Sequence, residues 1–227
     1  MKRGLKRVKI FILRNFKWIV LFICLIIFLQ LLQEAFEKEI MKKDIIGYYF
    51  ISTYLISDFV TPIAKLITNI GGAFVIIPLT CLLIATIKNR KTGFSILFNL
   101  VLITALNLLL KNIVQRPRPT EYRMITETGY SFPSGHSMVS MAFYGFLIYL
   151  IYQYVKSKKL KVFLIVLLSL LILMIGTSRI YLGVHYTSDV LAGFVISISY
   201  LIIYTSGVKK FVIERERKYE EKKQENN

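Results

Sequence analysis

Three cations stand in short polar segments of an otherwise hydrophobic chain, at Lys111, Arg118 and Arg179. Arginine binds phosphate through two parallel N–H groups, and lysine adds a compact point charge. Ser134 and Gly135 follow a proline in a pattern typical of a helix N-terminus, where backbone N–H groups point at an anion. Together these five residues predict a cradle for the equatorial oxygens of a phosphoryl group in transfer.

The chain of 227 residues has two histidines, His136 and His185, and both lie in such polar segments. His185 and Asp189 are four residues apart, so they share one face of a helix. The carboxylate can hold one ring N–H and leave the other nitrogen free to attack, as the acid of a serine-protease triad does. We predict that His185 attacks phosphorus to form a phosphohistidine and that Asp189 orients it. His136 is predicted to protonate the leaving oxygen and later to activate water.

The elements that must position these residues are predicted to be membrane helices. Hydrophobic residues make up 55% of the chain, the mean hydropathy is +0.57, and apolar runs recur at a length that crosses a bilayer. The runs are continuous rather than alternating, which favours helices over a β-barrel. The predicted fold class is therefore an all-α, polytopic membrane protein. Its six transmembrane helices are expected at 18–33, 70–87, 94–111, 135–155, 162–178 and 187–207.

The first hydrophobic run follows a cluster of lysine and arginine, as the core of a secretion signal does. It is long, however, and ends at residues 30–34 without a small-residue cleavage pattern, so we interpret it as a retained anchor. Cys24 and Cys81 both fall within predicted spans, which favours buried free thiols over a disulfide or a metal site.

The formal net charge of +17 would suit a nucleic-acid partner in a soluble protein, but its distribution indicates a membrane topology instead. Of the 30 lysines and arginines, 21 lie in the arm up to residue 17, the turns at 88–91 and 156–161, and the tail from residue 209. If six helices alternate, these segments share one side. The positive-inside rule makes that side the cytoplasm, with both termini, and leaves the candidate catalytic residues outside. Binding of anionic lipid headgroups is an alternative role for the basic arms.

Between the first two predicted spans, residues 42–66 mix polar positions with apolar ones at mostly helical intervals. The apolar positions are Ile45, Tyr49, Ile56, Val60 and Ala64. An amphipathic helix lying in the outer headgroup region would fit this pattern. Such a helix either forms a lip over a lipid entrance or packs structurally at the interface, and the sequence leaves both open.

The order and spacing of the polar segments resemble the three signature motifs of the type-2 phosphatidic acid phosphatase superfamily, also called lipid phosphate phosphatases. The motifs read K-x6-R-P from Lys111, P-S-G-H to His136, and S-R-x5-H-x3-D from Ser178 to Asp189. The surrounding segments, 130–138 and 178–193, are similar to bacterial phosphatidylglycerophosphatase and undecaprenyl-pyrophosphate phosphatase members. Three motifs in the same order are more specific than one.

The resemblance implies a six-helix membrane fold with the helical core of acid phosphatases and vanadium haloperoxidases, and a metal-independent reaction without a cofactor. The outward loops offer Glu121, Glu127 and Asp189, too few and too scattered for a paired-metal clamp. Family spacing selects Arg118, which leaves Arg116 as either an extra phosphate contact or a solvated charge. Carried over by motif, phosphate binding falls to Lys111, Arg118, Ser134, Gly135 and Arg179, and catalysis to His136, His185 and Asp189.

We therefore expect a single transmembrane phosphatase domain over 1–227, with a basic arm at 1–17, catalytic motifs at 111–189 and a charged tail at 209–227. It would remove the terminal phosphate of a lipid phosphate or diphosphate at the outer leaflet of the plasma membrane. Candidate substrates are undecaprenyl pyrophosphate, phosphatidylglycerol phosphate, phosphatidic acid and diacylglycerol pyrophosphate. The expected partners are the lipid substrate and the bilayer, without nucleic acid, and the sequence does not define an oligomeric state.

Two alternative functions share features with this one. A phosphotransferase that passes the phosphate to another lipid or sugar would use the same residues. A phosphate-binding transporter is disfavoured, because transport calls for charged or helix-breaking features near the bilayer midplane, whereas the predicted spans are uninterrupted.

Overall fold

The computed structural model describes residues 2–37 and 40–213, with side chains for residues 15–37 and 40–212. The predicted basic arm of 1–17 is described mainly by its backbone, which is helical. Of the predicted charged tail of 209–227, residues 214–227 lie outside the described residues.

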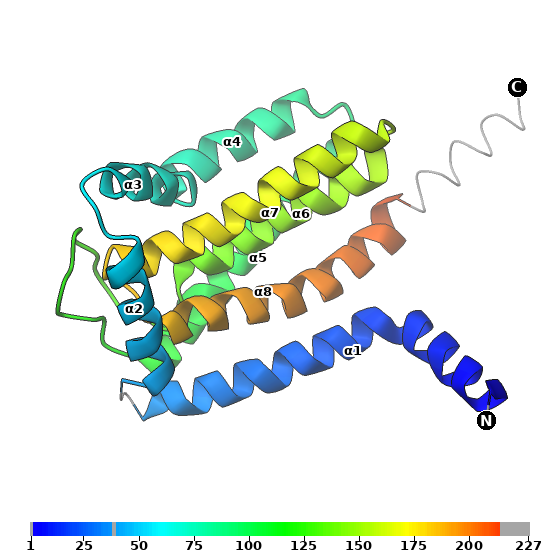
Figure 1. Cartoon of the computed structure of the whole chain (residues 1–227). Coiled ribbons are helices and arrows are strands. Elements are labelled where there is room, and N and C mark those ends of the chain that lie inside the picture. The colour runs from blue at the N-terminus through cyan, green and yellow to red at the C-terminus, as the bar shows by residue number, and fades with distance from the viewer. Residues whose placement is uncertain (1, 38–39, 214–227) are drawn as a thin grey trace, which may run out of the picture.

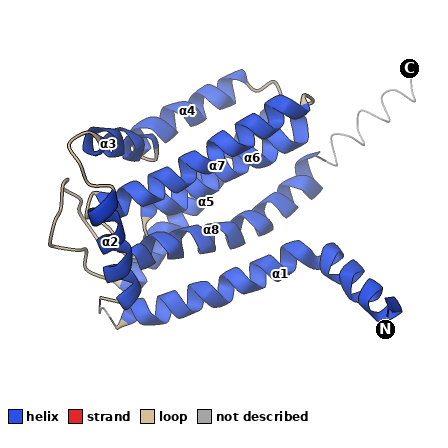
Figure 2. Ribbon diagram, in the orientation of Figure 1, coloured by secondary structure: helices blue, strands red, loops and turns tan. Residues whose placement is uncertain are grey.

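The described residues form eight α-helices and one π-helical turn, and contain no strand (Figures 1 and 2). The all-α, polytopic fold expected from the sequence is thereby confirmed. The elements in chain order are α1 (Lys2–Phe36), α2 (Lys42–Tyr54), α3 (Val60–Ile70), α4 (Ala73–Thr86), α5 (Arg90–Val114), α6 (Gly135–Tyr154), α7 (Lys158–Tyr181), α8 (Thr187–Val208) and the π-helical η1 (Lys209–Ile213).

Five helices are each long and apolar enough to cross a membrane, namely α1, α5, α6, α7 and α8. The helices α3 and α4 supply a sixth span when this bent pair is taken as one. The predicted span at 70–87 is therefore wrong at its start, because α4 begins at Ala73 and α3 precedes it at an angle of 45°. The expectation that all spans are uninterrupted is wrong at the same place.

The bend between α3 and α4 occurs at Gly71 and Gly72, where the chain passes close to α7. A Cβ atom on Gly71 would lie 2.4 Å from Cγ2 of Ile175, so an approach this close requires glycine. The consequence is that α3 tilts across α7 and brings Thr68 to the end of that helix.

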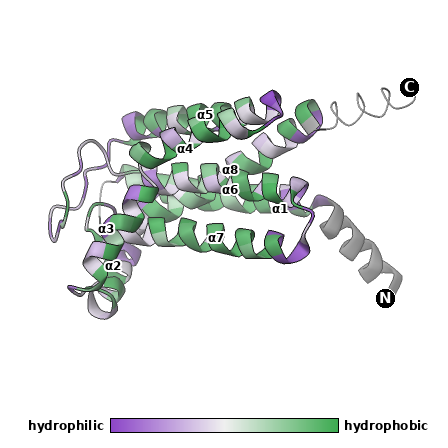
Figure 3. Cartoon of the chain, turned by 90° about the horizontal axis from the view of Figure 1, so that it is seen from above, coloured by the Kyte–Doolittle hydropathy of each residue, from purple (hydrophilic) through white to green (hydrophobic). Residues whose placement is uncertain are grey.

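Helix α6 lies at the centre of the bundle and packs against α5, α7 and α8, while α1 packs along α8 (Figure 1). Phe143 and Phe146 of α6 are fully buried among apolar side chains that include Ile96 and Ile175. Elsewhere large apolar side chains point outward, as Phe74 does with 98% exposure. Figure 3 shows hydrophobic residues along the length of the helices, which is the surface that a lipid environment favours.

The expected single amphipathic helix over 42–66 is wrong, because the chain bends between α2 and α3 at residues 55–59. The charged residues of α2 lie in its first turn, and apolar side chains of the following turns lie on both the buried and the exposed side of the helix, with Ile51 buried and Ile46 exposed. Helix α2 lies across one end of the bundle rather than along it (Figure 1). Amphipathic patterning belongs to α3, whose Ala64 and Thr68 are buried.

Both cysteines are free thiols, as predicted, and Cys24 is buried. Cys81 lies on the surface of the protein, so its predicted burial is wrong. An apolar membrane span satisfies the hydropathy pattern whether its side chains face other helices or lipid, which is why the sequence did not separate the two cases.

The two ends of the bundle differ in chemistry. The ends of α5 and α7 and the starts of α6 and α8 meet beside α2, and these four ends carry the predicted motifs (Figure 1). The turns at 88–91 and 156–161, with their lysines and arginines, lie at the opposite end, together with the start of α1 (Figure 1). This distribution is the one that the predicted topology requires.

Close contact between α6 and α8 generates a test of the packing. A Cβ atom on Gly193 would lie 3.0 Å from Ser137 Cβ and 3.1 Å from the Ser134 carbonyl oxygen. Gly193→Ala should therefore destabilise the fold by about 1–3 kcal/mol through overpacking, measured as thermal unfolding in detergent. Gly207→Ala is the matched control, because a Cβ there meets no atom within 4 Å and alanine favours the helix. Equal stability of the two variants would contradict this description of the contact.

Candidate active site

The predicted site residues come from five parts of the chain and meet at the end of the bundle covered by α2. The His136 ring lies within electrostatic range of four charged groups, those of Arg179, Glu127, Arg118 and Lys111. The His185 ring lies within range of Arg118, Arg179, Lys111 and His136. Both imidazoles thus lie beside one cluster of cations.

The imidazole of His185 is held between an acid and an arginine. Its Nδ1 lies 3.4 Å from Oδ2 of Asp189, and its Nε2 lies 3.0 Å from Nη1 of Arg118. Arginine can only donate, so Nε2 is the acceptor and the ring proton resides on Nδ1, facing the carboxylate. Burial lowers the pKa of His185 well below its usual value, and the charges of Arg118 and Arg179 act in the same direction. The ring is therefore neutral, with the tautomer that the sequence analysis predicted for a nucleophile.

Arg118 is fixed by backbone carbonyl groups on both of its sides. Its Nε donates to Gly129 at 3.0 Å and its Nη2 donates to Thr128 at 3.0 Å, while Nη1 also reaches the carbonyl of Val184 at 3.0 Å. The loop between α5 and α6 therefore wraps around this guanidinium. The arrangement places a fixed positive charge beside the Nε2 atom of His185.

Arg179, in the last turn of α7, is buried and pairs with two side chains that the sequence analysis did not assign to the site. Its Nη1 donates to Thr68 Oγ1 at 2.7 Å, and its Nη2 pairs with Oε1 of Glu127. The other carboxylate oxygen of Glu127 lies 3.9 Å from Arg118 Nη2. Burial alone would raise the pKa of Glu127, but the charge and hydrogen bond of Arg179 hold the pKa below its usual value. An ionised carboxylate thus lies between two of the predicted phosphate-binding arginines.

Lys111 lies in the last turn of α5, close to the start of α6, and its ammonium group donates to the carbonyl of Tyr130. A Cβ atom on Gly135 would lie 3.0 Å from Oδ1 of Asn107 and 3.9 Å from Cε of Lys111. Glycine at this position lets the first turn of α6 approach the lysine. The Nδ2 group of Asn107 fixes the same junction by donating to the carbonyl of Pro133 at 3.2 Å.

Ser134 caps α6, as its position before the helix predicts, since its hydroxyl oxygen accepts from the N–H of Ser137. Its own N–H is not available to an anion, because it donates to the carbonyl of Asp189 at 3.0 Å. The N–H groups that follow, at Gly135 and His136, belong to the first turn and have no carbonyl one turn earlier in the helix. They are the backbone donors that remain for a phosphate.

Arg116 departs from both interpretations that the sequence left open. It is fully buried, so it is not a solvated charge. Its Nη1 donates to Oδ1 of Asp189 at 2.8 Å and its Nη2 donates to Oδ2 of Asp44 at 2.9 Å, so it pairs with carboxylates rather than lying in the cation cluster. Motif spacing distinguished Arg118 from Arg116 but gave no sign of Asp44, which lies far away in the sequence.

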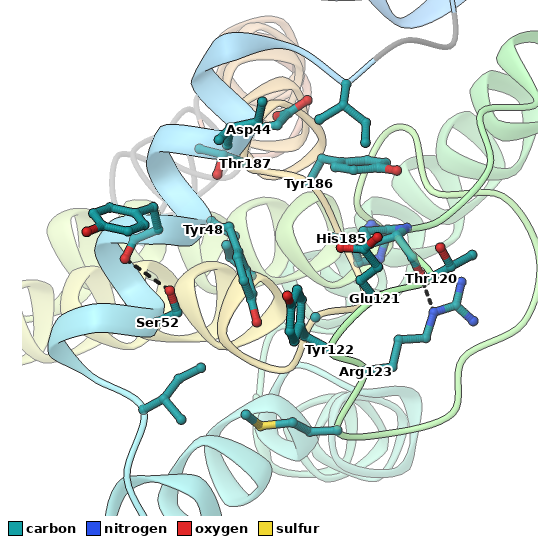
Figure 4. Close-up of a pocket in the computed structure, with 18 residues that line it drawn as sticks. Asp44, Tyr48, Ser52, Thr120, Glu121, Tyr122, Arg123, His185, Tyr186 and Thr187 are labelled. Carbon is teal, nitrogen blue, oxygen red and sulfur yellow. Dashed lines mark hydrogen bonds between the residues drawn. The ribbon is translucent and has the colours of Figure 1, made fainter.

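A cavity of about 870 Å³ separates α2 from the loop that follows α5 (Figure 4). Among the predicted site residues, His185 lines it. The rings of Tyr48 and Tyr122 stack at 5.5 Å between centroids, and both face this cavity (Figure 4). The cavity is lined mainly by apolar and aromatic side chains, among them Ile45, Ile56 and Met124. An apolar space therefore meets the candidate nucleophile from the side of α2.

Residues 92–213, more than half of the chain, match the model of the PAP2 superfamily. The chain belongs to this superfamily. All three predicted motifs fall within the matched residues, and the resemblance inferred from them is confirmed.

Among curated PAP2 relatives, the phosphatidylglycerophosphatase B of Bacillus subtilis is 33% identical over 132 residues, which cover 56% of this chain and 65% of that protein. The chain therefore matches slightly less than two thirds of that relative. The undecaprenyl-diphosphatase of Sulfolobus acidocaldarius is 28% identical over 214 residues, covering 87% of this chain and 96% of that protein.

Two solved structures share the fold. A crystal structure of a transmembrane PAP2-type phosphatidylglycerolphosphate phosphatase from Bacillus subtilis superposes with a TM-score of 0.73, at 25% identity, covering 83% of this chain and 96% of the other. Aquifex aeolicus LpxE gives a TM-score of 0.57 at 22% identity, covering 70% of this chain and 92% of the other.

The position of Glu127 generates a prediction about anion binding in this PAP2 chain. Glu127 pairs with two arginines that are proposed to bind phosphate. Because Glu127→Gln removes the competing negative charge, it should tighten the binding of inorganic phosphate by about 3- to 10-fold, which corresponds to at most about 1.4 kcal/mol. The measurement is competitive inhibition by phosphate, or calorimetry with the purified protein. Glu121→Gln removes the same charge from an exposed position in the same loop and should leave the phosphate affinity unchanged. Weaker binding in Glu127→Gln would show that the carboxylate assists phosphate rather than competes with it.

Proposed function

We propose that this protein is an integral membrane phosphatase that hydrolyses the terminal phosphate of a lipid phosphate or lipid diphosphate. The observation that carries the proposal is the neutral His185, held by Asp189 on one side and facing the cation cluster with its other nitrogen. An uncharged imidazole beside fixed positive charges is suited to attack an anionic phosphoryl group, because those charges attract the substrate and stabilise the transition state.

The reaction proceeds in two displacements. In the first, Nε2 of His185 forms a bond to phosphorus while the bond from phosphorus to the leaving oxygen breaks. His136, which takes up a proton as the anionic phosphoryl group enters beside it, gives that proton to the leaving oxygen. An entering phosphoryl group takes over the hydrogen bond of Arg118, which frees the Nε2 lone pair. Asp189 stabilises the positive charge that develops on the ring. The products of this step are a phosphohistidine and the dephosphorylated lipid, or the lipid monophosphate when the substrate is a diphosphate.

In the second displacement water attacks phosphorus, His136 accepts the proton of that water, and the bond between nitrogen and phosphorus breaks. Inorganic phosphate leaves and the neutral His185 is restored. Lys111, Arg118 and Arg179 neutralise the phosphoryl oxygens in both steps, so the mechanism is proposed to need neither a metal ion nor a cofactor. Phosphate transfer to a lipid or sugar would differ only in the acceptor of this step, which product analysis distinguishes.

Two observations support a lipid as the substrate. The cavity beside His185 is lined mainly by apolar side chains and borders α2, whose exposed Ile46 and Phe50 lie outside the cavity lining and suit contact with the bilayer. The relatives named above bear the names of enzymes for phosphatidylglycerol phosphate and undecaprenyl diphosphate. These two compounds, with phosphatidic acid and diacylglycerol pyrophosphate, are the proposed candidate substrates.

The proposed topology places the site on the outer face of the plasma membrane. The basic turns lie at the opposite end of the bundle, which the positive-inside rule assigns to the cytoplasm. A transporter is less well supported. The one bend among the described spans lies beside the cation cluster, where Thr68 holds Arg179, and so serves the site at the end of the bundle.

The direct test is phosphate release from a panel of purified lipid phosphates in detergent, with a chelator present. Wild type should remain active, and His185→Ala should lose at least about a thousandfold in rate, because the nucleophile is gone. Labelled phosphate should appear as inorganic phosphate rather than on an added lipid or sugar. Activity that requires a divalent metal, or that persists in His185→Ala, would contradict the proposed mechanism.

The lip hypothesis for the α2–α3 bend has its own test. Ile56 lines the cavity, and Ile56→Asp should slow turnover of a lipid phosphate by about tenfold while leaving a soluble phosphate ester nearly unaffected, since an apolar chain then loses its contact. Phe59→Asp is the control, because Phe59 is exposed in the same bend and does not line the cavity. Ile56 and Val60 both pack against a buried cluster, so thermal unfolding of Ile56→Asp is measured to show that the variant is folded. Equal losses of turnover on the lipid phosphate and the soluble ester would contradict the lip hypothesis and favour a structural packing role.

A further inference from the structure

The acid behind the candidate nucleophile is itself held by a buried arginine. Asp189 is fully buried, and its Oδ1 accepts from Nη1 of Arg116 at 2.8 Å. Its Oδ2 accepts from the N–H of Tyr186 at 2.9 Å and faces Nδ1 of His185 at 3.4 Å. The carboxylate is thus bound more closely by Arg116 than by the histidine that it orients. The position of Asp189 is set by the arginine, and the position of His185 follows from it.

Arg116 is held in turn by Asp44, a residue of the first turn of α2. Oδ2 of Asp44 accepts from Nη2 of Arg116 at 2.9 Å, and its Oδ1 accepts from the N–H of Ser188 at 2.8 Å. The hydroxyl of Ser188 accepts from Nη1 of Arg116 at 2.8 Å. The ring of Tyr186 covers the guanidinium, 4.2 Å from its centroid. One buried guanidinium therefore joins the start of α2 to the start of α8.

This geometry leaves Arg116 unable to contact a phosphate directly. Both terminal nitrogens donate to carboxylates, and the side chain has no exposed area. A carboxylate buried as Asp189 is would tend to take up a proton, and a protonated acid would no longer attract the Nδ1 proton of His185. The paired guanidinium opposes that uptake by favouring the charged carboxylate, and it fixes which of the two oxygens faces the ring.

We propose that Arg116 and Asp44 are positioning residues of the phosphatase reaction, acting through Asp189 to hold His185 in its attacking orientation. The inference rests on the function proposed above. Because Asp44 belongs to α2, the same bridge ties the helix beside the cavity to the catalytic acid. Arg116 is thus a second functional arginine of the segment Arg116-Pro-Arg118, with a task different from that of its neighbour.

A double-mutant cycle tests this role. Arg116→Met should lower kcat on a lipid phosphate by about 10- to 100-fold, as is typical when the residue that orients a catalytic group is lost. In an Asp189→Asn background the same change should cost less than about threefold, because the carboxylate through which the arginine acts is already gone. Arg116→Lys, which keeps the charge, should recover part of the rate, and Asp44→Asn should fall between wild type and Arg116→Met.

Inorganic phosphate serves as the probe that separates positioning from phosphate binding. Its inhibition constant should be unchanged in the Arg116 and Asp44 variants and should rise in Arg179→Met. Lys65→Met removes an exposed cation on α3 and should match wild type in rate and in phosphate inhibition. Thermal unfolding and phosphate inhibition identify variants that are folded. If Arg116→Met does not fold, Arg116→Lys and Asp44→Asn are carried through the same cycle with Asp189→Asn.

The outcomes for the two proposals are distinct. Wild type that releases no phosphate from any lipid phosphate overturns the proposed function. The positioning role is overturned if wild type is active and the Arg116 substitutions lower kcat by the same factor with and without the Asp189 carboxylate. A raised inhibition constant for phosphate in Arg116→Lys also overturns it, since the arginine would then belong to the phosphate site.

Discussion

Burying guanidinium groups at the end of a membrane bundle is costly unless their N–H groups find acceptors, and this constraint organises the site. Arg118 is bonded by the carbonyls of Thr128, Gly129 and Val184. The acceptors of Arg179 are Thr68 of α3 and Glu127 of the loop between α5 and α6. The carboxylate acceptors of Arg116 are Asp44 of α2 and Asp189 of α8. Each arginine therefore bonds a different part of the chain at the same end of the bundle. Together these bonds hold the loop between α5 and α6 over the site.

The same constraint explains why a carboxylate lies where a phosphate is proposed to bind. Without substrate, Arg179 and Arg118 share Glu127, which neutralises part of the cluster. An incoming phosphate offers a higher charge and more acceptor oxygens than a carboxylate, so exchange of one anion for the other keeps the arginines satisfied. The cation cluster can therefore bind a phosphoryl group without leaving buried charges unpaired. Arg116 takes no part in this exchange, because its two terminal nitrogens pair with Asp44 and Asp189.

Much of this could be predicted from sequence because the signals are local. Apolar runs gave the positions of α5, α6, α7 and α8, and the spacing of His185 and Asp189 gave their contact. The partners that complete the site are not local. Asp44 lies 72 residues before Arg116, and Thr68 lies 111 residues before Arg179, so only the folded chain brings them together. The predicted span at 70–87 included the bend at Gly71, because hydropathy continues across it while the contact with Ile175 does not show in the sequence.

The central claim is that the imidazole of His185 attacks phosphorus, and rapid-quench labelling tests it most directly. A lipid phosphate labelled in its terminal phosphoryl group is mixed with excess enzyme, the reaction is stopped in alkali, and the labelled peptide is identified. The account predicts acid-labile, alkali-stable label on His185 that appears before free phosphate and decays as phosphate is released. Label on another residue, or a complete single turnover in which His185 never carries phosphorus, would contradict it.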